Sequence, residues 1–143
     1  GSNRENHDEG AESRVVVLGA TNTPWMVDSA FLRPGRFDRV VHVGLPTRVE
    51  REAVLRVHMG RMKIRDKGQT ATLPVLCSNI ADNTGGFSGA DLAALCRSAA
   101  IRCLLDSGED VEIEDRHFLE ALKHDVKASC SENLVQRLLK WLP

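Results

Sequence analysis

The sequence predicts an α/β fragment, in which two short strands of a parallel sheet precede a small all-α domain. Short β-branched runs at residues 14–20 and 40–43 predict the strands, because continuous apolar runs of this length are typical of strands buried on both faces. From Thr47 onward the apolar residues recur at the helical period, and capping boxes open helices there. The chain therefore divides into an α/β part and a helical part.

The predicted boundaries follow these changes of pattern. Residues 1–13 are charged and lack periodicity, so we expect a flexible leader, and the initial Gly-Ser pair is typical of a cleaved expression tag. Residues 14–46 form the α/β part, and residues 47–143 form the helical domain.

The composition limits the expected partners and location. The 143 residues include 19 lysines and arginines and 20 aspartates and glutamates, which gives a net charge of −1. A nearly neutral chain has no long-range field to hold a polyanion, so nucleic acid is not an expected partner. No apolar run approaches the roughly 20 residues that a membrane span needs. We therefore expect no direct membrane insertion and an intracellular location, either cytoplasmic or nuclear.

Within the α/β part, the sequence predicts strand, loop, turn and strand. The first strand ends at the polar break of residues 21–24, and Asp28 can cap a brief helical turn through Leu32. Pro34-Gly35 ends this turn before the second strand begins.

The helical part is predicted to contain four helices and a final helical turn or two. Thr47 with Glu50, and Ser88 with Asp91, form the two capping boxes. The predicted elements are a helix over 48–62, a second from Pro74 to the stop at Gly85-Gly86, a third from Ser88 to about Ser107, an extended piece at 111–114, a fourth helix capped by Asp115, and a last turn within 134–142.

The sequence lacks the cysteine pairs typical of metal sites and the usual catalytic motifs. Cysteines at positions 77, 96, 103 and 130 form no C-x-x-C pair, so we interpret them as reduced thiols in the core and predict no metal site. The sequence contains no G-x-S-x-G, H-E-x-x-H or G-x-x-x-x-G-K-[ST] motif. It therefore has no phosphate-binding loop of the P-loop type.

Asn22 is the first candidate for chemistry. It directly follows the first predicted strand, where an amide on a rigid element can hydrogen-bond a water or a phosphate oxygen. The alternative is a plain Asx turn ahead of Pro24.

Three arginines form the second candidate group. Arg33, Arg36 and Arg39 lie at three-residue spacing around a Pro-Gly turn. A guanidinium group is planar and always charged, which suits the charge that develops on a phosphoryl group during transfer. The alternative is a set of surface salt bridges with Asp28 and Asp38, each worth about 1 kcal/mol or less.

At these residues the sequence resembles a known family. The stretch VVVLGATNTPWMVDSAFLRPGRFDRVVHVGLP, residues 15–46, closely resembles the sensor-1 strand and second region of homology of AAA ATPases. TGGFSGADLAALCRSAA, residues 84–100, resembles the helical lid motif of that family. The similarity runs from Arg14 to Trp141 and is strongest to the branch of valosin-containing protein and its Afg2-like relatives. It implies the C-terminal part of a P-loop AAA module, followed by its helical lid domain.

The resemblance implies catalytic roles for the candidates. Asn22 would be sensor 1, which orders the attacking water near the γ-phosphate, and so would be both a catalytic and a nucleotide-binding residue. Arg36 and Arg39 would be arginine fingers that reach into the neighbouring subunit's site. Arg33 matches a position that is also credited with a finger role in some tandem-ring relatives, and its role stays open.

The lid would supply further nucleotide contacts. His58, in LRVHMGRM, matches a histidine that contacts the ribose or the base in relatives, and Gly89 and Ala90 match the pair beside the base. The chain departs from the family pattern at residues 25–27, where Trp-Met-Val is bulkier than the usual run.

For the parent protein, the resemblance implies an ATP hydrolase that uses ATP with magnesium. A hexameric ring would couple hydrolysis to protein unfolding or complex remodelling, with the other subunits of a homo- or hetero-hexamer, protein clients and adaptors as partners. The fragment lacks a phosphate loop, so we expect it to be inactive alone and to bind no nucleotide stably. Two alternatives stay open: a truncated, non-catalytic AAA subunit or adaptor that supplies arginine fingers in trans, and a fragment of an FtsH-type metalloprotease, which shares LRPGRFDR.

The resemblance also has a consequence for the two predicted strands. In the family, the strand that leads into the phosphate loop lies between them, so both would have open edges here. We expect them to pair with each other, to pair across a dimer or to pack irregularly, while residues 47–143 fold on their own.

Overall fold

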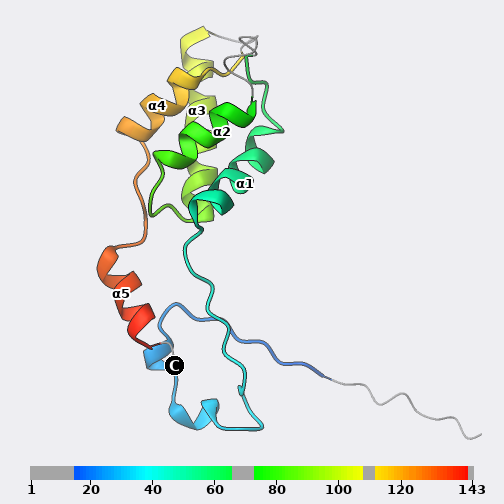
Figure 1. Ribbon diagram of the computed structural model, residues 1–143, viewed down its shortest axis with the longest axis vertical. Helices are drawn as coiled ribbons and strands as arrows, with labels where there is room; N and C mark the ends of the chain where they lie inside the picture. The colour runs from blue at the N-terminus through cyan, green and yellow to red at the C-terminus, as the bar shows by residue number, and fades with distance from the viewer. Residues whose placement is uncertain (1–14, 66–72, 108–111, 142–143) are drawn as a thin grey trace, which may run out of the picture.

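The computed structural model describes residues 15–65, 73–107 and 112–141, and these ranges are mainly helical (Figure 1). Two short 3₁₀ helices, η1 (Pro24–Met26) and η2 (Ser29–Leu32), come first. The α-helices are α1 (Arg48–Met59), α2 (Leu73–Asp82), α3 (Gly89–Ser107), α4 (Asp115–His124) and α5 (Glu132–Trp141). None of the helices in the described ranges is long and apolar enough to cross a membrane.

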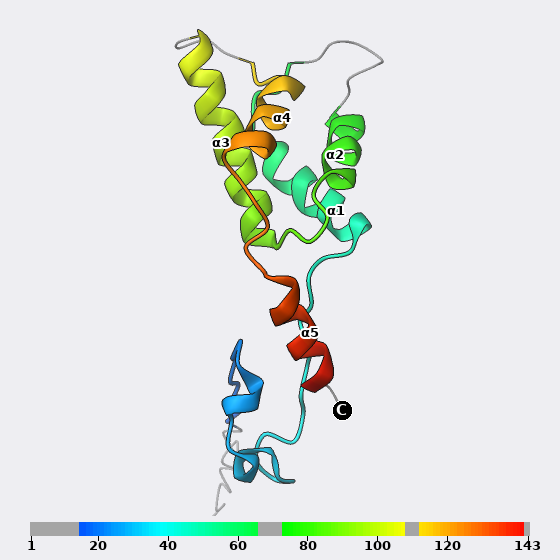
Figure 2. The same cartoon turned by 90° about the vertical axis from the view of Figure 1, so that its left-hand side faces the viewer.

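Helices α1 to α4 pack around one hydrophobic core, and α5 stands apart from them (Figures 1 and 2). Cys77, Cys96 and Cys103 are free and buried in this core, as the sequence predicted, whereas Cys130 is free but only half-buried and lies outside the core. Burial raises the pKa of the Cys96 thiol to about 11, so this thiol stays protonated near neutral pH. The core comprises Leu55, Met59, Leu76, Cys77, Ile80, Ala81, Phe87, Leu92, Leu95, Cys96, Ala99, Cys103, Ile113, Phe118 and Ala121.

The two predicted capping boxes are confirmed. At α1, the backbone N–H of Thr47 donates to Glu50 Oε2 at 2.7 Å, and the Thr47 side chain accepts from the backbone N–H of Glu50. At α3, the backbone N–H of Ser88 donates to Asp91 Oδ2 at 2.8 Å, and Asp91 N–H donates back to Ser88 Oγ at 3.2 Å. Each box satisfies backbone donors that a helix start otherwise leaves unpaired.

Several helix ends differ from the prediction. Helix α1 ends at Met59 rather than Met62, because the chain turns at Gly60, whose N–H still donates to Arg56 O at 2.9 Å. Helix α2 ends at Asp82, ahead of a glycine turn in which Gly86 has a left-handed φ of +79°. Glu114, not Asp115, is the N-cap of α4, and its N–H donates to His117 Nδ1 at 3.0 Å.

The predicted extended piece at 111–114 is described only from residue 112. There, Ile113 forms an isolated parallel bridge with Ile64. Ile113 N–H donates to Lys63 O at 2.8 Å, and Arg65 N–H donates to Ile113 O at 2.9 Å. This bridge ties the segment after α1 to the segment before α4.

The two predicted strands do not form within the described ranges, so that part of the predicted fold class is wrong for this structure. Residues 15–20 and 40–43 join no strand ladder, and their apolar side chains are exposed, with Leu18 at 90% and Val43 at 89%. A parallel strand needs neighbours that pair its backbone and cover both faces. Among the described residues, no such neighbours lie beside these segments, and the two segments do not pair with each other. Pairing across a dimer stays a prediction.

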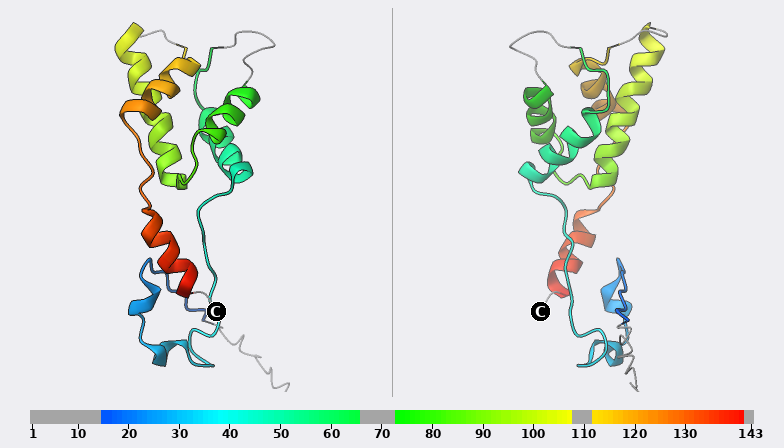
Figure 3. Two further views of the ribbon diagram at one scale, coloured as in Figure 1. Left: turned by 60° about the vertical axis from the view of Figure 1, so that its left-hand side comes forward. Right: turned by 90° about the vertical axis from the view of Figure 1, so that its right-hand side faces the viewer.

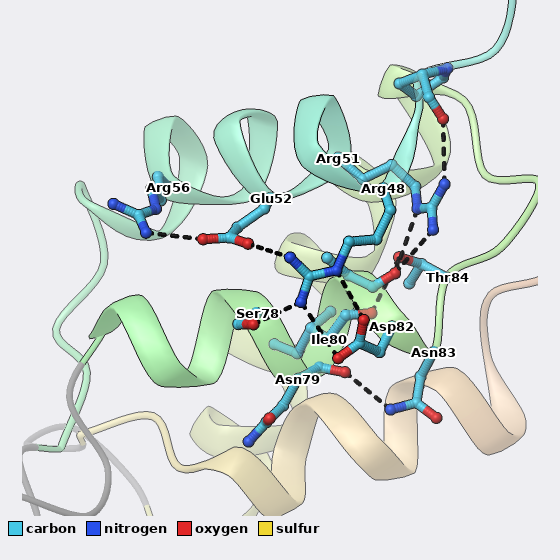
Figure 4. A network of polar contacts seen from close by, with 12 residues as sticks. Arg48, Arg51, Glu52, Arg56, Ser78, Asn79, Ile80, Asp82, Asn83 and Thr84 are labelled. Carbon is cyan, nitrogen blue, oxygen red and sulfur yellow. Dashed lines mark hydrogen bonds and ion pairs between the residues drawn. The ribbon is translucent and has the colours of Figure 1, made fainter.

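Two connections extend from the four-helix core, one to the part of the chain before it and one to α5 after it (Figure 3). The first leads into α1 and is held by Arg51, whose guanidinium donates to Pro46 O at 3.1 Å and to Ala81 O at 2.9 Å (Figure 4). The second leads from α4 to α5 and is held by Ser129, whose hydroxyl donates to Asp91 Oδ2 at 3.0 Å. Both anchors lie on the same helical core.

Candidate functional site

Asn22 lies in an exposed loop just ahead of η1. The loop is shaped by Thr21, whose hydroxyl accepts from Thr23 N–H at 3.1 Å. The Asn22 side chain is exposed and makes no hydrogen bond within the described part of the chain. The turn is therefore built by the threonine hydroxyl and not by an Asx turn at Asn22, which leaves the amide open to solvent or a ligand.

The arginine turn is fixed by local hydrogen bonds. Asp28 Oδ1 accepts from Ala30 N–H at 2.8 Å, so Asp28 caps η2 as predicted. Phe37 N–H donates to Phe31 O at 3.0 Å and closes the loop that follows. Gly35 has a φ of +84°, a left-handed conformation that glycine adopts without strain. The backbone that carries the three arginines is therefore set by the sequence of the turn itself.

The arginine side chains do not form the surface salt bridges that were the alternative for them. Arg33, Arg36 and Arg39 are exposed, and no salt bridge joins them to Asp28 or Asp38 in the described residues. Arg36 folds back and donates from Nη1 to Ala30 O at 2.9 Å, which uses one of its five donors. The remaining donors are available to an anion from outside this chain.

The lid residues lie on α1 and at the start of α3. His58 is exposed near the C-terminal end of α1. Gly89 and Ala90 form the exposed first turn of α3, and a Cβ added at Gly89 would meet no atom within 4 Å. The space beside this helix start is open.

Asp91 fixes the first turn of α3. Burial alone raises the pKa of this carboxyl, but hydrogen bonds from Ser88 and Ser129 outweigh that effect, so its pKa lies below the usual aspartate value. The Ser129 backbone N–H donates at 3.2 Å in addition to the hydroxyl. One carboxylate thus holds both the helix start and the linker that leads to α5.

The candidates therefore fall into two groups. Asn22 and the arginines belong to the segment before α1, and His58, Gly89 and Ala90 belong to the helical core. No hydrogen bond or ion pair in the described ranges joins the groups. Among the described residues no cluster of three or more His, Cys, Asp or Glu side chains could hold a metal ion. We therefore name no magnesium ligand among them.

Sequence reasoning missed two residues that position these groups. Arg51 falls on the core stripe with Leu55 and Met59 at four-residue spacing, and this spacing could have shown that it is buried. Arg137 lies over the Trp25 ring, with 4.0 Å between its guanidinium carbon and the ring centroid. No local pattern links residues so far apart in the sequence.

The family models that match this chain cover both parts. The model described as the ATPase family associated with various cellular activities (AAA) matches residues 3–45, and the AAA+ lid domain matches residues 75–120. The chain belongs to the AAA family of ATPases. The chain is 42% identical over 110 residues to the ATPase family protein 2 homolog of Caenorhabditis elegans. The alignment covers 77% of this chain and 14% of that protein.

Other AAA relatives show the same partial coverage. The ATPase family gene 2 protein homolog B of Homo sapiens is 42% identical over 116 residues, which is 79% of this chain and 14% of that protein. The cell division cycle protein 48 homolog of Archaeoglobus fulgidus is 34% identical over 151 aligned positions, covering 93% of this chain and 20% of that protein. The chain thus spans a fifth or less of these curated relatives, which belong to the branch that its motifs indicated.

A solved structure shows the same fold. The crystal structure of the FIGL-1 AAA domain in complex with ADP matches with a TM-score of 0.75 and 24% sequence identity, over 88% of this chain and 43% of that chain. At this identity the likeness shows the fold alone. The 88% that it covers is more of the chain than residues 47–143 alone.

Proposed function

We propose that this chain is the sensor and lid part of an ATP hydrolase that works as a hexameric ring. In this proposal the ring couples hydrolysis to protein unfolding or complex remodelling, and the phosphate loop and magnesium ligands come from outside the 143 residues. The observation that carries the proposal is the rigid arginine turn, whose guanidinium groups are exposed and have no carboxylate partner in the described ranges. The partners would be the other ring subunits, protein clients and adaptors.

Each candidate has a role in this proposal. Asn22 orders the attacking water, and its free amide next to a hydroxyl-stabilised turn supports that role. Arg36 and Arg39 reach the phosphate of the neighbouring subunit, where a finger raises the rate by about 10³ to 10⁵. His58, Gly89 and Ala90 hold the base end of the nucleotide, and the open space beside Gly89 supports that placement.

The finger assignment predicts a specific loss in the parent protein. Arg36→Ala and Arg39→Ala should each lower kcat for ATP by at least about 10³-fold while leaving nucleotide affinity nearly unchanged, because the finger acts on a neighbour's site. The assay is steady-state hydrolysis by assembled rings, with nucleotide binding measured in parallel. Arg97→Ala, an exposed arginine on α3, is the matched control and should hydrolyse normally.

Mixed rings test whether the fingers act in trans. Subunits with Asn22→Ala and subunits with Arg36→Ala should each retain only a small, measurable residual activity alone. When they are mixed, some interfaces combine an intact Asn22 on one subunit with an intact Arg36 on its neighbour, and activity should return in part. Normal hydrolysis by Arg36→Ala and Arg39→Ala rings, or no recovery on mixing, would contradict the proposal.

A further inference from the structure

Helix α5 makes a contact that neither the family motifs nor the capping signals explain. It is separate from the four-helix core and lies against η1 (Figures 1 and 2). Its half-buried side chains are Leu134, Val135, Leu138 and Trp141, which share one helix face. Arg137 lies on this helix and stacks over Trp25, with 4.0 Å from its guanidinium carbon to the ring centroid.

Trp25 is joined to Asn22 by a short, hydrogen-bonded stretch of backbone. Met26 N–H donates to Thr23 O at 2.9 Å, and Val27 N–H donates to Pro24 O at 3.1 Å. Pro24 is buried, whereas Thr23 and Trp25 on either side of it are half-buried. Local hydrogen bonds therefore hold the backbone that leads from the Asn22 loop to Trp25, three residues away.

The other end of α5 is connected to the first turn of α3. The linker ahead of α5 is held by Ser129, which donates twice to Asp91, and Asp91 caps the helix start that carries Gly89 and Ala90. The helix and its linker thus connect the lid residues to the Asn22 loop without passing through the core.

We propose that Arg137 and Trp25 are positioning residues, which hold the Asn22 loop in the orientation that hydrolysis requires. The proposal rests on the proposed ATPase function for its consequence, but the contact itself can be tested without nucleotide. A planar guanidinium group packs over an indole ring with defined geometry, and Trp25 provides an indole where the family run is less bulky. Catalytic groups lose rate sharply when their placement is loosened.

The first experiment tests the contact on this chain. The sequence has two tryptophans, so Trp141→Phe leaves Trp25 as the only indole emitter. In that background, Arg137→Ala should shift the Trp25 emission to longer wavelength and make it easier to quench with acrylamide. Lys140→Ala is the matched control, because it removes a positive charge from the same helix without touching the ring. An unchanged Trp25 signal in Arg137→Ala, or an equal change in Lys140→Ala, would overturn the contact.

The second experiment tests positioning in the parent ring. Arg137→Ala and Trp25→Leu should lower kcat for ATP several-fold with little change in KM, and Trp25→Phe should restore much of the rate because it keeps an aromatic face. Equal loss in Trp25→Phe and Trp25→Leu, or unchanged kcat in Arg137→Ala, would overturn the positioning role.

A double-mutant cycle separates positioning from general damage. In an Asn22→Ala background, Arg137→Ala should cost no further activity, since residues that act as a unit are not additive. Full additivity would overturn the proposal. If the proposed function were wrong, Arg36→Ala rings would hydrolyse ATP normally. The fluorescence test of the contact between Arg137 and Trp25 does not depend on that result.

Discussion

Arg51 shows how one buried cation can fix the geometry between two parts of a chain. Its side chain is only 9% exposed and donates three hydrogen bonds, two to Ala81 O and one to Pro46 O. No carboxylate pairs with it in the described ranges; the acceptors are the carbonyls at the end of α2 and at the start of the connection. Carbonyl oxygens at a helix C-terminus carry partial negative charge, which favours a cation there.

We predict that Arg51→Met lowers the free energy of unfolding by about 1–3 kcal/mol, because it leaves buried carbonyls without donors. The matched control is Arg56→Met, which breaks only an ion pair with Glu52 at 2.7 Å on the surface of α1. That pair should be worth about 0.5 kcal/mol or less. Denaturant unfolding followed by circular dichroism gives both values. Equal losses in the two variants would contradict the anchoring role of Arg51.

At the scale of elements, α3 and α4 are joined by Asp125, directly after α4. Arg102 of α3 donates to both of its oxygens at 2.6 Å, and Ser98 Oγ donates to Oδ2 as well. The hydrogen bonds from Arg102, and then the one from Ser98, lower the pKa of Asp125 to about 2. Because the folded state binds the proton more weakly than the unfolded state, this contribution to stability is present above the usual aspartate pKa and is lost as the pH falls towards 2.

Asp125→Asn should therefore reduce the dependence of stability on pH in the acid range. Between the usual pKa of 3.8 and the folded value of about 2, the wild-type chain should lose stability more steeply than the variant. Urea unfolding at a series of pH values measures this slope. Glu120→Gln removes a longer contact to the same arginine, at 3.3 Å, and should keep a nearly wild-type slope. An unchanged slope in Asp125→Asn would contradict the assignment.

The helix caps and the predicted strands show which parts of the fold are determined by the local sequence. The capping boxes at Thr47 and Ser88 were predictable because all their atoms lie within one turn. The strand predicted at residues 14–20 does not form in its described part, 15–20, because a β-branched run favours a strand only when other segments supply its hydrogen bonds. The candidate site shows the same contrast between contacts within one turn and contacts between distant segments. The arginine turn was predictable from Pro34-Gly35 and Asp28, which lie within it. The Ser129–Asp91 contact was not, because it depends on how the linker to α5 packs against α3.

At the scale of the whole molecule, the exposed apolar segments do not contribute to the folding stability of the helical core. Val16 is 79% exposed and Val41 is 82% exposed, so neither contributes to the core around α1 to α4. Exposed β-branched runs with unpaired backbone are sites for association between chains. The unfolding transition of the chain should therefore report the helices alone.

We predict that Val16→Lys with Val41→Lys reduces aggregation of this chain at high concentration while changing the unfolding free energy by about 0.5 kcal/mol or less. Light scattering measures the first effect, and thermal unfolding followed by helical circular dichroism measures the second. Leu95→Ala, in the core, is the contrasting variant and should cost about 2–5 kcal/mol. A drop in stability for the lysine pair as large as that for Leu95→Ala would show that the segments belong to the folded core.

The two connections on either side of the helical core restrict how that core can move. A body attached at one point can swivel in any direction, but a body attached at two separate points can turn only about the line that joins them. The anchors at Arg51 and at Ser129 define such a line, so we expect the four helices to rotate most easily about it relative to the segment that carries the arginines. In the proposed ATPase, we expect a change at Gly89 and Ala90 to turn the four helices about this line.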